Sequence, residues 1–233
     1  MKALYKKELM QYLNNPVGYV VPLLFALFAN YLFMKDVFVV GSASMKSFFG
    51  VVPWLLFIFI PALAIRSFSE EKRTNTIEVL MTLPLSEQDI VLAKILSLLT
   101  ISTGALVLTF SVPLVLGGIS KLFIPEVLIG YVGLFLLSAA YVAFSVYVSS
   151  RVSNQIASFL ASVLILFVAT TLSSDFLANI LPKVAQDFLL FASPLLHMEN
   201  FAKGVVDLRS LFYFVGLTFL FFRLTVMELQ KRG

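Results

Sequence analysis

Residues 127–148 have the sequence VLIGYVGLFLLSAAYVAFSVYV, which contains no charged side chain. A helix rises 1.5 Å per residue, so this run would reach about 33 Å and cross the roughly 30 Å hydrocarbon core of a bilayer. Pro125 and Glu126 precede it and suit a helix start, because proline is tolerated in the first turn and a carboxylate favours the positive end of the helix dipole. The stretch therefore predicts a membrane-spanning helix.

Further segments have nearly the same length and character, which predicts six spans. The others are residues 16–34, 48–65, 95–116, 156–172 and 211–227. The last is the least uniform, because Arg209 and Arg223 bracket a short apolar run, and we expect Arg223 to extend from the final turns toward the headgroups. The expected fold class is an all-α polytopic membrane protein.

The composition of the whole chain agrees with this class. Hydrophobic residues make up 60% of the 233 residues and charged residues 13%, against about 25% in a soluble domain. Such a chain has too few polar groups to cover a soluble globule and too many apolar groups to stay disordered. The lack of cysteine and the single histidine, His197, exclude disulfides, thiolate zinc sites and paired-histidine metal sites.

Six spans place both termini on one side of the membrane, and the basic residues predict which side. The side with the termini carries 11 of them: Lys2, Lys6, Lys7, Arg66, Lys72, Arg73, Lys94, Arg151, Arg223, Lys231 and Arg232. The other side carries six: Lys35, Lys46, Lys121, Lys183, Lys203 and Arg209. Because basic loops stay in the cytoplasm, we expect a multi-pass plasma-membrane protein with both termini cytoplasmic. The same bias explains the net charge of +4 without nucleic acid binding.

Residues 1–15 are expected to form an amphipathic helix along the cytoplasmic leaflet, the alternative being a plain basic lead-in. One face would carry Tyr5, Leu9, Tyr12 and Leu13, and the rest of the helix Lys2, Lys6 and Gln11. The apolar run after these residues is long enough to span the bilayer, which is not typical of a signal peptide.

The loop between the second and third spans, residues 67–86, has the sequence SFSEEKRTNTIEVLMTLPLS and is the most polar part of the chain. Asn75 tolerates a left-handed backbone, so we expect a turn there between two short helical pieces. Ser86 stands three residues before Asp89, a pattern that starts the next helix. An exposed apolar edge, made by Ile77, Leu80 and Met81, would adjoin the charged run of residues 70–73, as is typical of a docking surface.

Two other connections differ in length. The link at residues 149–155 is brief, and Ser153 is the expected N-cap of the fifth span. The outer connection, residues 173–210, has many apolar residues that Pro182 and Pro194 interrupt. We expect two or three short amphipathic helices there, dipping into or resting on the outer leaflet.

The chain lacks the patterns of an enzyme or of an ion-coupled carrier. It contains no phosphate-binding loop, dinucleotide fingerprint, zinc-protease motif or nucleophile elbow. All 13 acidic residues fall in loops or near span ends, which leaves no mid-membrane carboxylate for a proton or sodium relay. We expect His197 to be interfacial or packed, and hydroxyls in the spans to bond neighbouring helices. Small residues at four-residue spacing would pack spans within one chain or between two: Ala139 with Ala143, and Ala157 with Ala161.

The loop after the second span resembles that of the permease subunits of ABC-2 type ABC transporters. The resemblance lies in residues 61–80, PALAIRSFSEEKRTNTIEVL, in LPLS at 83–86 and in Lys94. Asn75 stands where the family's Glu-Glu-Lys-x-x-Gly-Thr-Ile-Glu core has glycine, a mild departure because both residues favour the same turn. Residues 149–157 and 197–207 are similar to the gliding-motility-associated branch, and the resemblance covers essentially the whole chain.

This resemblance implies one permease domain over residues 1–233. It would contain a connecting helix at 1–15, a cytoplasmic coupling helix within 67–86 and external helices within 173–210. Two permease chains, identical or related, would pair and each dock a separate ATP-binding subunit, which carries the ATP and magnesium; no cofactor is expected on the chain itself. The expected coupling residues are Glu70, Glu71, Lys72, Arg73, Thr74, Asn75, Thr76, Ile77, Glu78, Leu80 and Met81, with Arg151 and Asn154 as a second cytoplasmic contact.

Three functions compete. The chain could be the permease of an ATP-driven exporter, a non-transporting scaffold that anchors a cytoplasmic ATPase or another partner, or an intramembrane enzyme. The polar, helix-forming loop on the basic side favours the permease, and the enzyme lacks a catalytic constellation. Cavity walls of Phe, Leu and Val would suit a lipid-like or amphiphilic cargo, although lipid-facing walls have the same composition.

Overall fold

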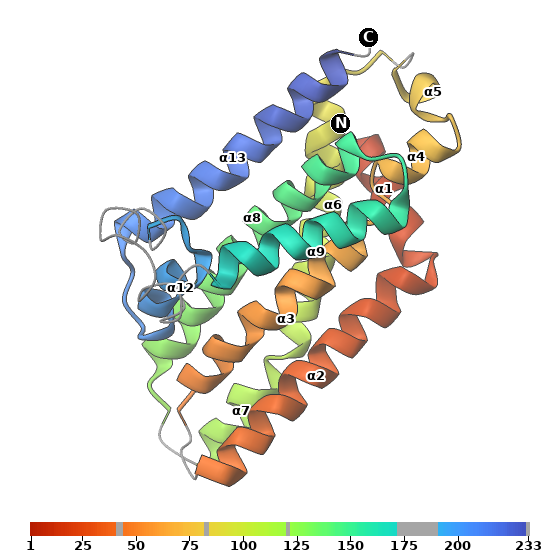
Figure 1. Cartoon of the computed structure of the whole chain (residues 1–233). Helices are drawn as coiled ribbons and strands as arrows, with labels where there is room; N and C mark the ends of the chain where they lie inside the picture. The colour runs from red at the N-terminus through yellow and green to blue at the C-terminus, as the bar shows by residue number, and fades with distance from the viewer. Residues whose placement is uncertain (41–43, 82–83, 120–121, 172–190, 232–233) are drawn as a thin grey trace.

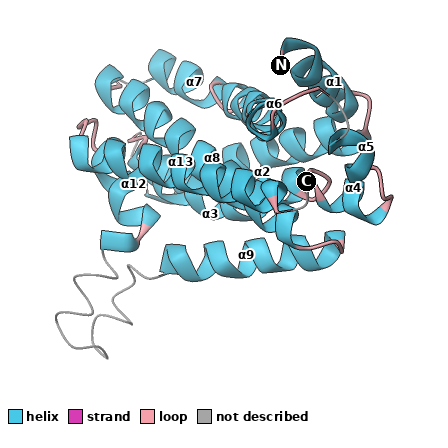
Figure 2. Ribbon diagram, turned by 90° about the horizontal axis from the view of Figure 1, so that it is seen from above, coloured by secondary structure: helices cyan, strands magenta, loops and turns pink. Residues whose placement is uncertain are grey.

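The computed structural model describes residues 1–40, 44–81, 84–119, 122–171 and 191–231, and all regular structure within these ranges is helical (Figures 1 and 2). The helices are α1 (Lys2–Leu13), α2 (Pro16–Val40), α3 (Lys46–Ala64), α4 (Ser69–Arg73), α5 (Ile77–Met81), α6 (Glu87–Leu108), α7 (Ser111–Ile119), α8 (Ile124–Arg151), α9 (Gln155–Thr171), α12 (Pro194–Ala202) and α13 (Leu208–Gln230).

The described helices confirm the all-α polytopic membrane fold. Five stretches are long and apolar enough to cross a membrane: Pro16–Lys35, Lys46–Arg73, Glu87–Gly118, Ile124–Arg151 and Leu208–Gln230. The remaining predicted span, the fifth in chain order, corresponds to α9, a shorter apolar helix of 17 residues. Every predicted span therefore coincides with an apolar helical stretch.

The third predicted span is not one helix but two. α6 ends at Leu108 and α7 begins at Ser111, with Thr109 and Phe110 in a turn between them. Pro113 explains the break, because its ring would collide with the carbonyl four residues earlier, at Thr109, if the helix continued. The Thr109 hydroxyl donates to the carbonyl of Leu106 at 2.6 Å and lies 3.0 Å from the Tyr131 hydroxyl of α8, which secures the turn.

The central helix of the bundle is α8, which packs against α3, α6, α9, α12 and α13 (Figure 2). Its residues 137–146 are all buried, so this helix has no lipid-facing stripe over that length. Ala139 and Ala143 lie in this stretch, as the small-residue spacing predicts. On α9 the buried residues of the corresponding pattern are Ser158 and Ser162, whereas Ala157 is exposed.

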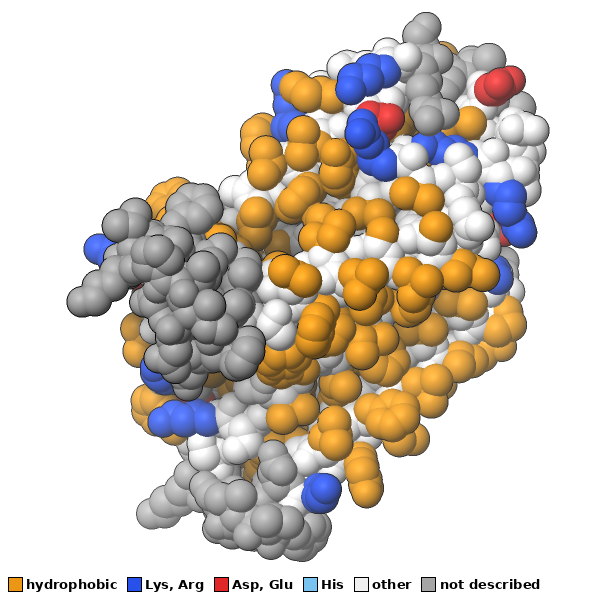
Figure 3. Space-filling view, in the orientation of Figure 1, with side chains coloured by type: hydrophobic (Ala, Val, Ile, Leu, Met, Phe, Trp, Pro, Cys, Tyr) orange, Lys and Arg blue, Asp and Glu red, His pale blue; other side chains and the backbone are white. Residues whose placement is uncertain are grey.

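The two ends of the bundle differ in what they carry. Both termini, α1, α4 and α5 lie at one end, which we call the terminal end; α7 and α12 lie toward the other, the far end (Figure 1). Between them, apolar side chains cover the visible face, and Lys and Arg side chains gather toward the two ends (Figure 3). Outward-facing residues such as Leu27 on α2, Leu164 on α9 and Phe219 on α13 are more than 60% exposed, as suits a lipid-facing surface.

The outer connection is described only in part. Residues 172–190, on which the first of the predicted external helices fall, lie outside the described residues. The described part contains α12, which confirms a helix before the last span. α12 packs against α8 and α3 and buries Met198 and Phe201 completely, so one of its faces belongs to the bundle.

Candidate functional site

The polar loop at the terminal end folds into two short helices around a left-handed turn. Asn75 has φ of 55°, which confirms the predicted turn, because asparagine tolerates this left-handed backbone better than most residues do. The backbone N–H of Thr76 donates to the carbonyl of Glu71 at 2.9 Å, and that of Asn75 to Lys72 at 3.3 Å. This pair of bonds is a Schellman motif, which ends α4 sharply and sets the direction of α5.

The start of α4 is capped by a residue of another helix. Ser149, near the end of α8, accepts hydrogen bonds through its Oγ from the backbone N–H groups of Phe68 and Ser69, each at 3.0 Å. These are first-turn groups that have no partner within their own helix. From the last turn of α4, the Lys72 ammonium donates to the carbonyl of Ser150, one of the unpaired carbonyls at the end of α8. α4 is thus attached to α8 at both of its ends.

A buried charged cluster attaches α4 on its other side. Lys94 of α6 donates through Nζ to Glu71 Oε1 at 2.7 Å, to Glu8 Oε2 of α1 at 3.1 Å, and to the carbonyl of Ser67 at 3.1 Å. The side chains of Lys94 and Glu8 are each 3% exposed and that of Glu71 is 15% exposed. We call Lys94, Glu8 and Glu71 the charge clamp, since one cation holds carboxylates from two helices.

Two aromatic residues enclose the charge clamp. The Phe68 ring centroid lies 5.0 Å from Lys94 Nζ, a cation–π contact that adds to the ion pairs. Tyr12 of α1 is buried, and this burial raises the pKa of its hydroxyl above the ordinary value, with the charges of Glu8 and Glu71 acting in the same direction. Tyr12 therefore stays neutral and adds no third negative charge to the cluster.

Several predicted coupling residues face inward, which corrects the expected docking edge. Ile77 and Leu80 are 8% and 5% exposed and belong to the hydrophobic core, so they form no exposed apolar edge. Glu71 and Lys72 are engaged by α6 and α8, as described above. The side chain of Met81 lies outside the described residues.

The remaining predicted residues form an exposed polar surface, which we call the coupling ridge. Its members are Glu70, Arg73, Thr74, Asn75, Thr76 and Glu78, of which all but the half-buried Glu70 are exposed. Glu70 pairs with Arg66 one turn earlier, at 3.9 Å. The ridge carries charge and hydrogen-bonding groups on a backbone that the Schellman turn, Ser149 and the charge clamp hold in place.

The second predicted contact also has local structural roles. Arg151 pairs with Glu228 at 2.7 Å and so joins the ends of α8 and α13. Asn154, not Ser153, is the N-cap of α9, because its Oδ1 accepts from the backbone N–H groups of Ile156 at 2.9 Å and Ala157 at 3.3 Å. α4 contacts both α8 and α9, so this link lies on the same end of the bundle as the ridge.

At the far end, His197 is a packed side chain. It is 7% exposed, its Nδ1 lies 3.0 Å from Ser210 Oγ, and its Nε2 lies 2.9 Å from the carbonyl of Phe191. Its ring stacks on Tyr213 with centroids 4.0 Å apart. Among the described residues no group of three or more His, Cys, Asp or Glu side chains is placed to hold a metal ion. These contacts confirm the packed role for His197.

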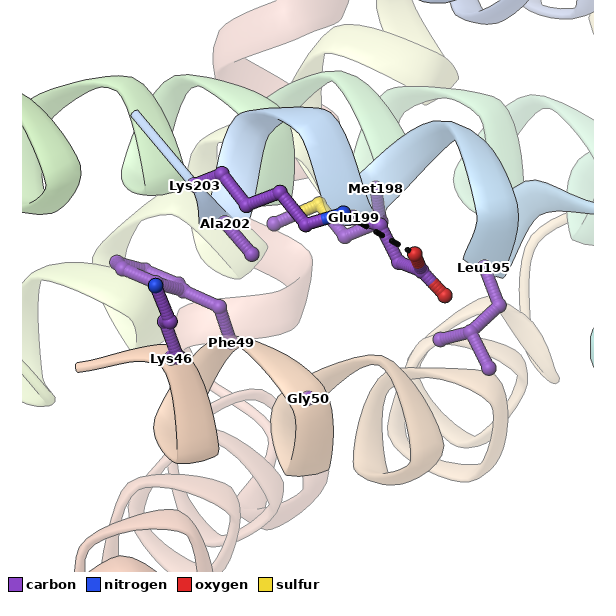
Figure 4. Close-up of a pocket in the computed structure, with 8 residues that line it drawn as sticks. All are labelled: Lys46, Phe49, Gly50, Leu195, Met198, Glu199, Ala202 and Lys203. Carbon is purple, nitrogen blue, oxygen red and sulfur yellow. Dashed lines mark ion pairs between the residues drawn. The ribbon is translucent and has the colours of Figure 1, made fainter. Parts of the chain in front are cut away.

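A small hollow of about 190 Å³ opens between the start of α3 and α12 (Figure 4). Its lining consists of Lys46, Phe49, Gly50, Leu195, Met198, Glu199, Ala202 and Lys203. Lys203 and Glu199 pair with each other at 3.5 Å, and both side chains are 57% exposed. Lys46 adds a third charged side chain, and the other lining residues are apolar or glycine.

Sequence reasoning missed two members of the site, Glu8 and Ser149. Glu8 lies between Leu4 and Tyr12 on the buried face of α1, at four-residue spacing from each. An acidic residue that shares a helix face with apolar residues was the feature of the sequence that could have indicated a buried charge. The predicted apolar face of α1 is correspondingly displaced: Leu4, Glu8 and Tyr12 are buried, while Leu13 is 49% exposed. Lys94 offered the same signal, as a charge within the apolar part of α6, but nothing in the sequence identifies its partners.

A bundle of apolar helices, five of them long enough to cross a membrane, is the architecture of a multi-pass membrane protein. The sequence model of a family described as ABC-2 family transporter protein matches residues 2–232, so the chain belongs to this family. It is therefore a permease component of an ABC transporter, a class that works with a partner ATP-binding subunit in a membrane. No curated protein matched the sequence.

Proposed function

We propose that the chain is the permease of an ATP-driven exporter and that its coupling ridge docks a cytoplasmic ATP-binding subunit. The observation that carries the proposal is the exposed polar surface of Arg73, Thr74, Asn75, Thr76 and Glu78, which lies at the end of the bundle that carries both termini and adjoins the contacts of α4 with α6 and α8. A charged, hydrogen-bonding surface of this kind gives register and a fast association rate to a docked partner. ATP-driven closure of that partner would then push on α4 and α5.

The same proposal includes topology and assembly. The basic residues, 11 on the side of the termini and six on the other, favour cytoplasmic termini in the plasma membrane. A second permease chain would pair with this one, because a transport pathway between chains needs two walls, and the apolar face of α9, exposed within the described part of the chain, offers one. The resemblance to ABC-2 permeases favours export, and residues 149–157 and 197–207 favour the gliding-motility-associated branch.

The test is a charge reversal on the ridge with a matched reversal at the far end. Arg73→Glu should abolish co-purification of the ATP-binding subunit, because it reverses a charge on the proposed docking surface. The fold should stay intact, since Arg73 is exposed. Lys46→Glu is the control, since Lys46 is an exposed cation at the opposite end of α3. Retention of the subunit by Arg73→Glu, or its equal loss from both variants, would reject the ridge as the docking surface.

A scaffold that merely anchors the ATPase is the second candidate, favoured by the same exposed ridge. The two functions differ in what the permease does to the partner after binding. A permease changes the ATPase rate of the bound subunit when both are reconstituted in lipid, whereas a scaffold leaves that rate as it is in the isolated subunit. The ATPase rate per bound subunit, with and without the permease, decides between them.

A further inference from the structure

The charge clamp joins three helices that meet at the terminal end. Glu8 belongs to α1, Glu71 to α4 and Lys94 to α6, so residues 86 and 23 positions away in the sequence share one ammonium group. The second oxygen of each carboxylate, Glu8 Oε1 and Glu71 Oε2, is buried without a hydrogen-bond partner among the described residues. Lys94 is thus the group that compensates both buried charges, which makes the attachment strongly dependent on this one side chain.

The coupling ridge is therefore continuous with α1. α1 rests on α6 with Leu4 and Tyr12 buried, and α4 is held to α6 through Glu71. α4 is also fastened to α8 through Ser149 and through Lys72. Any displacement of α4 must either carry α1 and the ends of α6 and α8 with it or break buried polar contacts.

We propose that Lys94 is a positioning residue that makes α1 and α4 a single rigid lever on α6. A push on the coupling ridge then reaches the N-terminal helix and two spans at once, instead of bending the loop. The inference rests on the proposed function for the source of the push, and on the contacts of the charge clamp for the rigidity. The two carboxylates hold different helices, since Glu8 attaches α1 to Lys94 and Glu71 attaches α4 to it.

This division predicts a pattern that distance measurements on the chain alone can test. The chain contains no cysteine, so single cysteines can carry spin labels at Lys6 on α1, Arg73 on α4 and Gln88 on α6, all of which are exposed. Pairs of labels in lipid nanodiscs report the α1–α4, α4–α6 and α1–α6 distances by pulsed electron paramagnetic resonance. We expect each distribution to be narrow in the parent protein.

The variants should loosen particular helices. Glu8→Gln should at least double the width of the α1–α4 and α1–α6 distributions and leave α4–α6 unchanged. Glu71→Gln should broaden α1–α4 and α4–α6 and leave α1–α6 unchanged. Lys94→Met should broaden all three, and Lys94→Arg should restore narrow distributions. The control is Arg66→Gln, which breaks the exposed ion pair next to the same short helix and should change none of them.

The lever would be rejected if Glu8→Gln and Glu71→Gln both kept distance distributions as narrow as those of the parent protein. It would also be rejected if each of these variants broadened all three distance distributions equally, which is the sign of general loosening. These two variants decide the question even if Lys94→Met fails to fold. The measurement needs no ATP-binding subunit, so its failure is distinct from failure of the proposed function. The proposed function fails if Arg73→Glu retains the ATP-binding subunit, or if Arg73→Glu and Lys46→Glu lose it equally.

Discussion

The contacts that attach α4 at the terminal end of this bundle differ in kind from those that pack α3 and α12 on α8 at the far end. At the terminal end, α4 is attached by ion pairs and hydrogen bonds from Lys94, Ser149 and Lys72. At the far end, α3 and α12 press against α8 where glycines leave room. A Cβ on Gly130 would lie 2.3 Å from the Phe49 ring, and one on Gly133 would lie 2.5 Å from Phe201 Cβ.

The difference bears on what each end is able to do. Polar contacts are directional, so they transmit a displacement from one particular side chain to the next. Removing one of these side chains interrupts the transmission. Close apolar packing resists displacement from every side and depends on volume. Gly204, with φ of 75°, brings its backbone against that of Glu126, which makes the far end tighter still. The terminal end thus suits force transmission, and the far end suits a fixed support.

The largest expected effect comes from removing the cation of the charge clamp. Lys94→Met leaves Glu8 and Glu71 buried without compensation, which should lower the free energy of unfolding by about 3–5 kcal/mol. Equilibrium unfolding in mixed micelles, followed by circular dichroism, measures the change. Replacing all three members by apolar residues of similar volume should recover most of the loss, and no recovery would show that the charges are not its cause.

A smaller loss is expected from Ile77, whose burial overturned the predicted docking edge. Ile77→Ala removes three buried carbon atoms and should cost about 2–4 kcal/mol in the same unfolding measurement. The neighbouring Glu78 is exposed, so Glu78→Ala should leave the free energy of unfolding within about 0.5 kcal/mol of the parent value. Equal effects of the two substitutions would contradict the inward orientation of Ile77.

Hydrophobic length and charge distribution made the fold predictable, because spanning helices need uninterrupted apolar runs whatever they pack against. The turn at Asn75 and the cap at Ser86 were also predictable, since both depend on local chemistry; the Ser86 Oγ accepts from the Asp89 N–H at 3.2 Å. The inward orientation of Ile77 and Glu71 was not. α4 and α5 have five residues each, too few for a periodic pattern to show which side is buried, and for Glu71 the contact with Lys94 of α6 decides it.

The helix break at Thr109 shows a different limit. Hydropathy treats residues 95–116 as one run, because Pro113 lies among apolar neighbours and leaves the average unchanged. The backbone restriction of proline acts on the preceding turn, and that effect is invisible to a hydropathy average. The partners of Lys94 were hidden for a related reason: a charge within the apolar part of a helix indicates that a partner exists, but its partner in α1 is 86 positions away.

The glycine contacts of the far end should respond to an added methyl group according to the space available. Gly133→Ala places a Cβ against Phe201 and Met198 and should cost about 1–3 kcal/mol, as overpacking does. Gly50→Ala is the matched control, because no atom lies within 4 Å of the added Cβ and the helix gains from losing a glycine. A parent-like Gly133→Ala in thermal unfolding would mean that α12 is free to move away from α8.

The smallest effect should come from the ion pair at the edge of the coupling ridge. Arg66 and Glu70 are 3.9 Å apart, and their side chains are 36% and 29% exposed, so water and salt screen the pair. Arg66→Gln should therefore change the free energy of unfolding by about 0–1 kcal/mol, and raising the salt concentration should remove the difference. The comparison with Lys94→Met is direct, since both substitutions delete a cation that faces a glutamate of α4. A loss from Arg66→Gln as large as that from Lys94→Met would show that the exposed side of α4 contributes as much as the charge clamp, and the rigidity of the ridge would then need a second source.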